Sequence, residues 1–506
     1  MSVFSRWAAG FAAIIALQSL AATAGAQDVT LSPRDGGLSI AGTLLAYDGE
    51  FYRIDSEFGE LTLDAQAVVC AGPGCPDLLT FVPEILAGGS PTIGEALLPA
   101  LLEGYGRMSG LELEMQSAPD GLTALVTDRT SGRQLARLGV AFTDSADGIA
   151  RLIDGQIDIA LSLLTVRDPA LRARVIALDA FVPVVSPDND LAAIALADLA
   201  AILSGRIESW AALGGPDLPI RLHLRNQGSA VNRLLEQRIL SGTPATPAAA
   251  PRRHATDAAL ARAVAADPLG IGLSLRSAAA EARIVPLRGG CGLAREATTL
   301  AIKAGDYPLT VPLMLYTRAE RLPLQARRLL AFSTGASAQP IVADAGFADQ
   351  TPTAMPLSAQ GERLANAIAA AGEGVSLADL QDLVVAMVGA DRLSYTFRFE
   401  TGSLRLTAQS EGNVERLAEA LETGRYARRE LVFAGFTDSD GPAAANLRLS
   451  SRRAEAVRRA VLDAAPLLDP ETVTLGVAGF GEAMPMDCDD TEAGRQVNRR
   501  VEVWLR

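Results

Sequence analysis

The stretch ALADLAAILSGRIESW, residues 195–210, sets the fold class of the middle of the chain. Its apolar residues Leu196, Leu199, Ile202 and Leu203 recur at helical spacing and so share one face of a helix. Gly205 follows them, and a glycine just past the last helical residue can end a helix in a left-handed conformation. The segment is therefore predicted to be an amphipathic helix of an α/β domain.

The same alternation of strands and amphipathic helices extends over residues 81–350. It is typical of a sheet with crossover helices. Residues 27–80 carry short alternating segments between glycine and aspartate turns, which predict a small β domain. Residues 351–392 have a helical period interrupted by glycines and are predicted to be a helical linker. Residues 393–506 combine the strands ELVFAGF, VTLGVAGF and RRVEVWL with helices in a βαβαβ order. We therefore expect an α/β multidomain protein.

Residues 1–26 have the features of a secretory signal peptide. Arg6 precedes the short apolar run WAAGFAAIIAL, and small residues stand at Ala24 and Ala26. No later run reaches the roughly 18 uninterrupted apolar residues that a membrane-spanning helix needs. The mature chain is expected to begin at Gln27 and to be exported to the periplasm.

The charge and the histidine content exclude several functional classes. The formal net charge is −14, and a nucleic-acid partner is excluded because phosphate backbones require a basic footprint. The only histidines, His223 and His254, are interpreted as isolated residues. Zinc sites and histidine-based catalytic triads therefore lack their ligands and bases. We expect no metal and no cofactor.

The four cysteines are predicted to form disulfides, because the chain is predicted to be exported to an oxidising compartment. Cys70 and Cys75, in CAGPGC, can close a small turn. Cys291 and Cys488 would then be left for each other and would join distant parts of the chain. Four cysteines permit three connectivities, and all three stay open at this point.

The C-terminal region carries a carboxylate and a guanidinium at a fixed spacing, in AGFTDSDGPAAANLRLSSRRAEAVRRAV, residues 434–461. Asp438 closes a strand just before a helix, where free amides and the helix dipole favour anions. Asn446 and Arg453 are seven residues apart and share one helix face. Asp438 and Arg453 can thus converge on a zwitterion, the aspartate receiving an ammonium group and the arginine a carboxylate.

This region, together with GRQVNRRVEVWL at residues 494–505, resembles the OmpA-like peptidoglycan-binding domain. The resemblance implies that Asp438 and Arg453 hold the free end of diaminopimelate in the stem peptide of peptidoglycan. Thr437, Asn446 and Arg499 belong to the same predicted site. The alternative is that Asp438 only caps the helix and that Arg453 only pairs with a surface acid. Many family members have histidine where Phe436 stands, so Phe436 is interpreted as a rim residue that alters binding strength.

The central region resembles phosphate-type periplasmic substrate-binding proteins, which implies two α/β lobes that close over a ligand. The residues that carry this resemblance include AGGSPTIGEALLPALLEGY, ILSGRIESWAALGG and RNQGS. It implies an anion site at the following positions: Ser90, Thr92, Arg225, Gly228 and Ser229.

Two departures from the family pattern weaken this anion site. The Gly-Ser-Gly-Thr turn of the family reads Gly228, Ser229, Ala230, Val231 here, which loses a hydroxyl. The polar cluster that usually follows DIAL is replaced by Ser162, Leu163 and Leu164. Each lost donor to a buried dianion costs on the order of 1–3 kcal/mol.

The sequence therefore predicts a periplasmic solute-binding protein anchored to the cell wall. Its C-terminal domain would bind peptidoglycan, and its central domain would capture a small anion such as phosphate for uptake or sensing. A membrane permease of an ABC transporter would then be a separate chain. The alternative is an envelope structural or interaction protein whose central domain has lost its small ligand. An enzyme is not predicted, because a serine nucleophile at Ser90 or Ser229 would need a base that no motif places there.

Overall fold

The computed structural model describes residues 28–78, 80–240, 251–289, 294–369, 371–372, 374–400 and 403–506. The predicted signal peptide lies outside these residues. The chain divides into two compact units, the first ending at Pro83 and the second running from Glu84 to Arg506. None of the helices in the described ranges combines the length and the apolar character that crossing a membrane requires.

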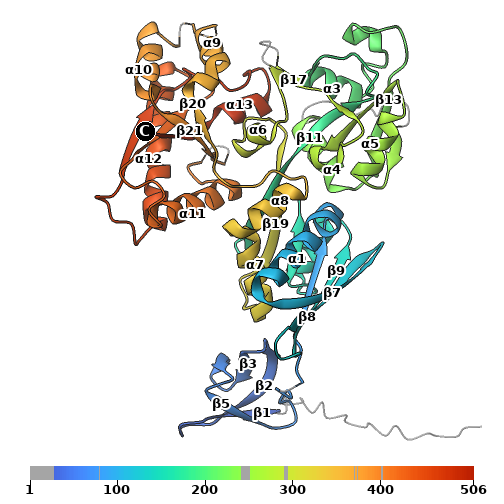
Figure 1. The fold of residues 1–506 in the computed structure, drawn as a ribbon, viewed down its shortest axis with the longest axis vertical. Helices are drawn as coiled ribbons and strands as arrows, with labels where there is room; N and C mark the ends of the chain where they lie inside the picture. The colour runs from blue at the N-terminus through green and yellow to red at the C-terminus, as the bar shows by residue number, and fades with distance from the viewer. Residues whose placement is uncertain are drawn as a thin grey trace, which may run out of the picture. The chain divides into compact units, whose positions relative to one another are not determined.

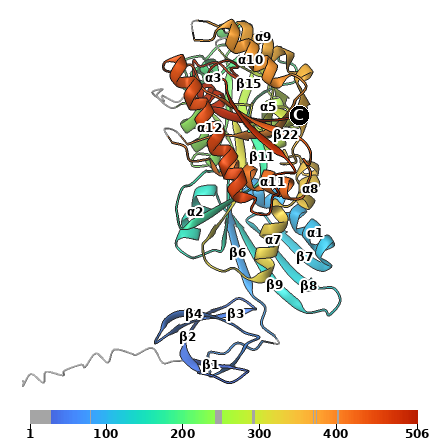
Figure 2. The same cartoon turned by 90° about the vertical axis from the view of Figure 1, so that its left-hand side faces the viewer.

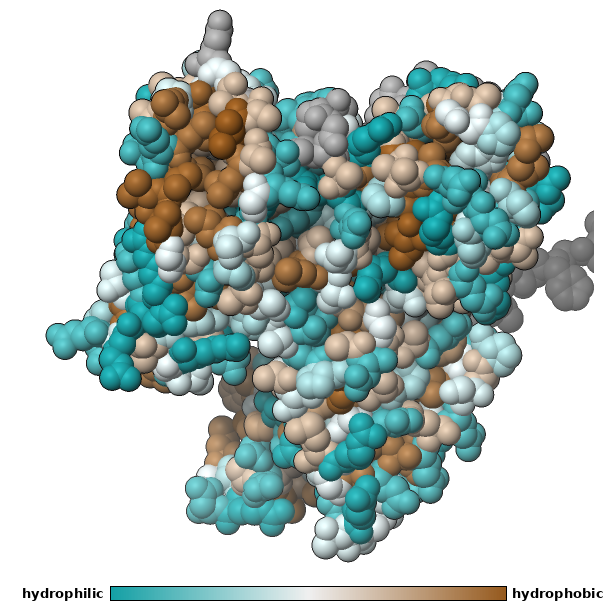
Figure 3. Space-filling model, turned by 45° about the horizontal axis from the view of Figure 1, so that its top comes forward, coloured by the Kyte–Doolittle hydropathy of each residue, from teal (hydrophilic) through white to brown (hydrophobic). Residues whose placement is uncertain are grey.

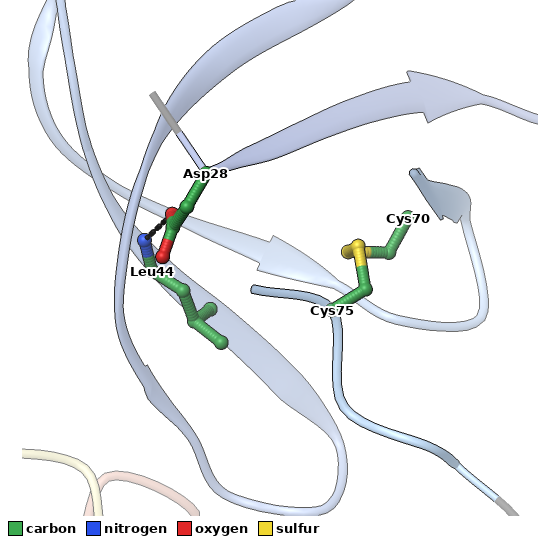
Figure 4. Close-up of a disulfide and its surroundings, with 4 residues drawn as sticks. All are labelled: Asp28, Leu44, Cys70 and Cys75. Atoms are coloured by element: carbon green, nitrogen blue, oxygen red, sulfur yellow. Dashed lines mark hydrogen bonds between the residues drawn. A yellow bond between two sulfur atoms is a disulfide. The ribbon is translucent and has the colours of Figure 1, made fainter. Parts of the chain in front are cut away.

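The first unit is a small antiparallel β domain, as predicted. Its sheet has the order β4-β3-β2-β1-β5. The strands are β1 (Val29–Pro33), β2 (Ile40–Tyr47), β3 (Phe51–Ser56), β4 (Gly59–Asp64) and β5 (Val68–Ala71). The predicted disulfide is present and joins Cys70 in β5 to Cys75 in the segment that follows this strand, and the carboxylate of Asp28 accepts a hydrogen bond of 2.8 Å from the Leu44 amide (Figure 4). The disulfide and this bond compensate for a core of only a few apolar side chains.

The central part of the second unit has two lobes joined by long strands (Figure 1). Strand β11 (Leu171–Val185) pairs with β19 (Thr310–Arg318) along its first part and with β15 (Gly270–Leu275) along its last. One chain segment therefore belongs to both lobes. The two-lobed periplasmic-binding-protein fold that was predicted is confirmed.

The first lobe contains a mixed sheet covered by helices (Figure 2). Strand β6 runs parallel to both β9 and β10, as expected where helices make the crossovers. Its strands are β6 (Glu84–Gly89), β7 (Leu111–Ala118), β8 (Gly121–Asp128), β9 (Gln134–Phe142) and β10 (Ile159–Ser162). Its helices are the π-helical η1 (Thr92–Leu97), α1 (Leu98–Ser109), α2 (Ser145–Ile153), α7 (Leu324–Thr334), the 3-10 turn η4 (Ala336–Ala338) and α8 (Gln339–Asp344).

The second lobe includes the helix that was predicted from residues 195–210. This helix, α3 (Leu196–Leu203), buries Leu199, Ile202 and Leu203 and is followed by Gly205 with φ 75°. The other helices are α4 (Ala230–Arg238), α5 (Asp257–Ala265) and α6 (Thr299–Lys303), with the 3-10 turns η2 (Trp210–Leu213) and η3 (Arg276–Ala278). The other strands are β12 (Ile194–Ala195), β13 (Arg221–Arg225), β14 (Arg252–His254), β16 (Arg283–Ile284), β17 (Leu287–Arg288) and β18 (Ala294–Arg295).

The C-terminal domain is built on a sheet of order β20-β21-β24-β22-β23. Its strands are β20 (Ala354–Pro356), β21 (Asp391–Phe397), β22 (Glu430–Phe436), β23 (Thr474–Gly479) and β24 (Arg500–Leu505). Its helices are α11 (Ala408–Glu422), α12 (Ala443–Ala464) and α13 (Glu492–Asn498). The structure thus adds β21 and α13 to the predicted elements. Helices α11 and α12 supply the apolar residues that pack on one face of the sheet.

The other face of this sheet is covered by residues that were assigned to a linker. Helices α9 (Gly361–Ala369) and α10 (Leu377–Met387), which follow the 3-10 turn η5 (Leu357–Gln360), pack against apolar side chains of β22 and β24. The outer side of the two helices exposes Ile368, Leu377, Val385 and Val388. Apolar surface gathers over this region (Figure 3). The segment therefore contributes a layer to the C-terminal domain.

Candidate binding sites

The chain places Asp438 between the end of β22 and the start of α12. Gly441, with φ 92°, turns the loop into the helix, and glycine adopts this left-handed conformation without strain. Asp438 is largely buried, and its Oδ2 atom accepts a hydrogen bond of 2.6 Å from Nη1 of Arg499. Arg499 also pairs with Glu492. Arg499 therefore holds the carboxylate of Asp438 in place.

Arg453 lies on α12 beside this carboxylate and is only 8% exposed. Among the residues that the structure describes, its Nε and Nη1 atoms have no hydrogen-bond partner, and its guanidinium lies 5.6 Å from the ring centroid of Phe399. Burial lowers the pKa of Arg453, the charge of Arg499 lowers it further, and Asp438 offsets part of the change. Arg453 is thus a desolvated cation with unused donors, which favours binding of an anion.

Thr437 and Asn446 flank this pair in different ways. The Thr437 hydroxyl is buried and has no hydrogen-bond partner in the part of the chain that the structure describes. The side-chain amide of Asn446 donates a hydrogen bond of 3.0 Å to the Asp440 carbonyl and one of 2.7 Å to the carboxylate of Glu482. Asn446 therefore braces the loop that carries Asp438, whereas Thr437 has an unused hydroxyl.

The rim interpretation of Phe436 is wrong. Phe436 is 1% exposed and lies in the apolar layer beneath α9 and α10. The Arg500 guanidinium lies 4.3 Å from its ring centroid, a cation–π contact inside the domain. Side chains alternate between the faces of a strand, and position 436 points to the face opposite α12.

Sequence reasoning missed a group of acidic residues near the same loop. A cavity of about 390 Å³ is lined by Thr437, Ser439, Glu482, Asp487 and Asp489 among others. Asp489 accepts a hydrogen bond of 2.8 Å from the Ser439 amide and another of 2.8 Å from the Asn498 side chain. Burial raises the pKa of Asp487. The three aspartates in MDCDD, residues 486–490, were the sequence feature that could have indicated this acidic group.

In the central domain, Ser90 and Thr92 lie where β6 turns into a helix. The Ser90 amide donates a hydrogen bond of 2.8 Å to the Leu161 carbonyl, and the Ser90 carbonyl accepts hydrogen bonds from the amides of Ile93 and Gly94. Within the described residues, no hydrogen bond engages the hydroxyl of Ser90 or Thr92. The two hydroxyls are therefore available to a ligand.

The other three predicted anion residues are engaged within the protein. Arg225 is buried at the end of β13, and its Nε atom lies 3.5 Å from a carboxylate oxygen of the buried Asp257, but among the described residues its Nε and Nη1 atoms have no hydrogen-bond partner. Burial raises the pKa of Asp257, and Arg225 opposes that rise. Gly228 has φ 83°, and the Ser229 hydroxyl caps α4 by accepting 3.3 Å from the Asn232 amide. Arg225 thus forms an ion pair with an internal carboxylate without a hydrogen bond at Nε or Nη1 to any described residue.

A carboxylate that the sequence did not single out joins the two lobes. Asp144 caps the N-terminus of α2 through the amides of Ala146 at 2.6 Å and Asp147 at 3.2 Å. Its other oxygen accepts a hydrogen bond of 2.8 Å from Nη2 of Arg233 on α4, and Arg233 also donates a hydrogen bond to the Gly228 carbonyl. A helix N-terminus that could receive an oxyanion therefore carries the protein's own carboxylate.

The interpretation of the two histidines as isolated residues is also wrong. His223 Nδ1 lies 3.1 Å from His254 Nε2, and His223 Nε2 lies 3.3 Å from Asp267. The neighbouring parallel strands β13 and β14 bring the two rings together. In the described part of the chain, no cluster of three or more histidine, cysteine or acidic side chains is arranged to hold a metal ion. Cys488 is bonded in a disulfide, whereas Cys291 lies outside the described residues, so their pairing stays a prediction.

Comparison with known protein families defines the class of both domains. A model of the PBP superfamily domain matches residues 80–337, which is just over half of the chain, and a model of the OmpA family matches residues 398–499. The chain therefore belongs to the PBP superfamily and carries an OmpA-family domain at its C-terminal end. These are binding and structural families, not enzyme families.

Individual relatives match only parts of the chain. Outer membrane porin F of Pseudomonas fluorescens is 37% identical over 118 residues, which are 23% of this chain and 34% of that protein. The probable lipoprotein YiaD of Escherichia coli is 27% identical over 134 residues, 26% of this chain and 56% of that protein. The chain thus spans between a third and just over half of the length of these relatives.

Two solved structures align with about half of this chain. An ABC-type phosphate transport receptor from Vibrio cholerae has a TM-score of 0.41 and 17% identity, covering 52% of this chain and 98% of that chain. A putative phosphate ABC transporter substrate-binding protein from Clostridium perfringens has a TM-score of 0.42 and 19% identity, covering 53% and 99%.

Proposed function

We propose that this protein is a periplasmic envelope protein that binds peptidoglycan through its OmpA-family domain. The observation that carries the proposal is the buried guanidinium of Arg453, which has unused donors beside the carboxylate of Asp438. A cation and an anion held close together match a zwitterionic ligand. The free end of diaminopimelate in the stem peptide carries one ammonium and one carboxylate group.

The proposed roles follow from the contacts of each residue. Arg453 donates to the ligand carboxylate, and Thr437 adds its unused hydroxyl. Asp438 receives the ammonium group, and Arg499 holds the carboxylate of Asp438 in position through its hydrogen bond. Asn446 keeps the loop in position through Asp440 and Glu482. Bound in this way, the protein stays associated with the cell wall.

Retention on purified sacculi tests this function. The mature protein is mixed with diaminopimelate-containing sacculi, and the bound fraction is measured after centrifugation. Asp438→Asn and Arg453→Gln are expected to weaken retention at least about tenfold, which is the loss of one charge-assisted contact. Arg452→Gln is the matched control, because Arg452 is the exposed neighbour of Arg453. Equal retention by all folded variants would refute the assigned site.

For the central domain, the Asp144–Arg233 pair favours the alternative function over capture of a small anion. Arg233 donates both to the carboxylate of Asp144 and to the carbonyl of Gly228. A phosphate bound by the predicted anion residues would therefore lie close to the negative charge of Asp144. These residues are Ser90, Thr92, Arg225, Gly228 and Ser229. Arg225 would also have to be shared with Asp257. We propose that the central domain has kept the two-lobed fold as an interaction module and does not bind phosphate tightly.

Thermal unfolding with oxyanions separates the two possibilities. A ligand that binds the native state must raise its stability, by about 2.7 kcal/mol at a hundredfold excess over Kd. The mature protein is expected to show no shift with millimolar phosphate or sulfate. A clear rise in Tm with phosphate that is lost in Ser90→Ala would establish the anion site instead.

A further inference from the structure

A second cavity of about 730 Å³ lies where the OmpA-family domain meets the joining strands of the central domain. One wall comes from the segment before β11, the last turn of α4 and the loop before β19. The opposite wall comes from the chain after β21, the start of α11 and helix α13. This volume falls within the range of about 300–1,000 Å³ that is typical of small-molecule sites. None of the predicted site residues lines it.

Two arginines in the wall are desolvated without an acidic partner. Arg238 donates a hydrogen bond of 2.7 Å to the Thr310 carbonyl, and Arg398 donates one of 2.7 Å to the Gly305 carbonyl. Among the described residues, neither guanidinium forms an ion pair. Burial lowers the pKa of both side chains, that of Arg398 to about 10. Both positive charges therefore favour an anionic group in the cavity.

A tyrosine in the same wall has an unused hydroxyl. Tyr307 is 1% exposed, and no other residue in the described ranges forms a hydrogen bond with its Oη atom. A buried phenol without a partner is costly to the fold. The unused hydroxyl of Tyr307 is therefore an independent indication that a polar ligand completes this cavity.

The carboxylate of Glu411 contributes the opposite charge. Glu411 on α11 lines the cavity, and no ion pair engages it within the part of the chain that the structure describes. Its pKa is raised by burial and by the nearby carboxylates of Glu400 and Glu415, and Arg405 offsets only part of this rise. Glu400 differs, because Arg167 pairs with it at 2.6 Å. Negative charge around Glu411 thus favours an ammonium group.

We propose that this cavity binds a small zwitterionic peptide whose carboxylate contacts Arg238, Arg398 and Tyr307 and whose ammonium group contacts Glu411. The volume of about 730 Å³ exceeds the needs of a single amino acid and accommodates a peptide of a few residues. The cavity contains neither Asp438 nor Arg453, so peptide binding here is independent of the proposed binding of peptidoglycan.

Calorimetry on the mature full-length protein tests the proposal with trialanine as the probe. Trialanine is expected to bind, and N-acetyl-trialanine and trialanine amide, which each lack one charge, are expected to bind at least about tenfold more weakly. Glu411→Gln and Tyr307→Phe are expected to weaken trialanine binding. Tyr307→Phe keeps the ring and removes only the unused hydroxyl, so the variant is expected to fold.

The matched control is Glu419→Gln, an exposed position two turns along the same helix and outside the cavity. It is expected to bind trialanine as the unmodified protein does. The proposal is overturned if trialanine fails to bind at millimolar concentration, if the capped peptides bind equally well, or if Glu411→Gln and Glu419→Gln have the same effect. Sacculus retention is measured in parallel and should be unchanged in Glu411→Gln.

Discussion

The carboxylate of Asp144 joins the two lobes of the central domain through a hydrogen bond of 2.8 Å from Arg233. The same carboxylate caps α2 through the Ala146 amide. The two interactions can be separated by substitution, because asparagine caps a helix but carries no charge.

Asp144→Ala is expected to lower the free energy of unfolding by about 1–2 kcal/mol, since it removes the cap as well as the ion pair. Asp144→Asn and Arg233→Gln should each cost less than about 1 kcal/mol, because both partners of the pair are partly exposed and the pair is screened. Urea unfolding of the three variants measures the difference. Equal losses for Asp144→Ala and Asp144→Asn would show that the ion pair, not the cap, dominates.

Glu502 lies at the centre of a buried charge network in the C-terminal domain. It pairs with Arg363 at 2.6 Å, Arg500 at 2.7 Å and Arg392 at 3.3 Å, and Arg392 also pairs with Asp306 of the central domain at 2.6 Å. Glu502→Gln would leave these arginines with too little negative charge. We expect the free energy of unfolding to fall by about 3–5 kcal/mol, measured by urea unfolding at pH 7.

The same network should make stability depend on acid. Burial alone would raise the pKa of Glu502, but the three guanidinium groups hold it well below its usual range. The stabilisation is therefore complete above the unfolded-state pKa of about 4.3 and declines as pH falls below it. Glu430→Gln is the control, because Glu430 forms a partly exposed pair with Arg506, which contributes little to stability. A Glu502→Gln variant no less stable than Glu430→Gln would contradict the assignment.

Asp179 on β11 should have the opposite pH dependence. Burial raises its pKa to about 6, although Ser277 donates to it at 2.5 Å. The folded state therefore binds the proton more tightly than the unfolded state, and stability falls by about 3 kcal/mol as pH rises from 4 to above 6. Asp179→Asn should remove this slope in urea midpoints measured between pH 4 and 7. An unchanged slope would place the titration elsewhere.

Local patterns in the sequence predicted most of the fold. Helical spacing and a terminal glycine predicted α3, and alternating segments predicted the first β domain. The role of residues 351–392 was harder to predict, because helical periodicity does not reveal which surface a helix covers. The sequence also could not show that Phe436 faces α9 and α10, since that depends on which side of β22 each neighbouring helix lies.

The candidate sites were predictable where their residues lie close in sequence. The turn at Asp438 and the helix carrying Arg453 are separated by 15 residues, and the structure places them together. The Asp144–Arg233 pair spans 89 residues and two lobes. The cavity lined by Arg238 and Glu411 requires two domains to meet. Such sites depend on tertiary packing, which no local spacing encodes.

The contact between His223 and His254 predicts that acid destabilises the second lobe. Burial lowers the pKa of both rings, and the charges of Arg225 and Arg252 lower that of His254 further. The folded state thus favours neutral imidazoles, so stability is lost as pH falls below the unfolded-state pKa of about 6.5. His223 is 1% exposed and can contribute at most about 1.4 kcal/mol per pH unit. A double variant with His223→Gln and His254→Gln should lose the histidine contribution to the pH dependence of stability, measured as urea midpoints between pH 5 and 7. Asp179 titrates equally in the double variant and in the unmodified protein, so it does not affect the comparison. An identical slope in the double variant would show that the pair does not titrate in this range.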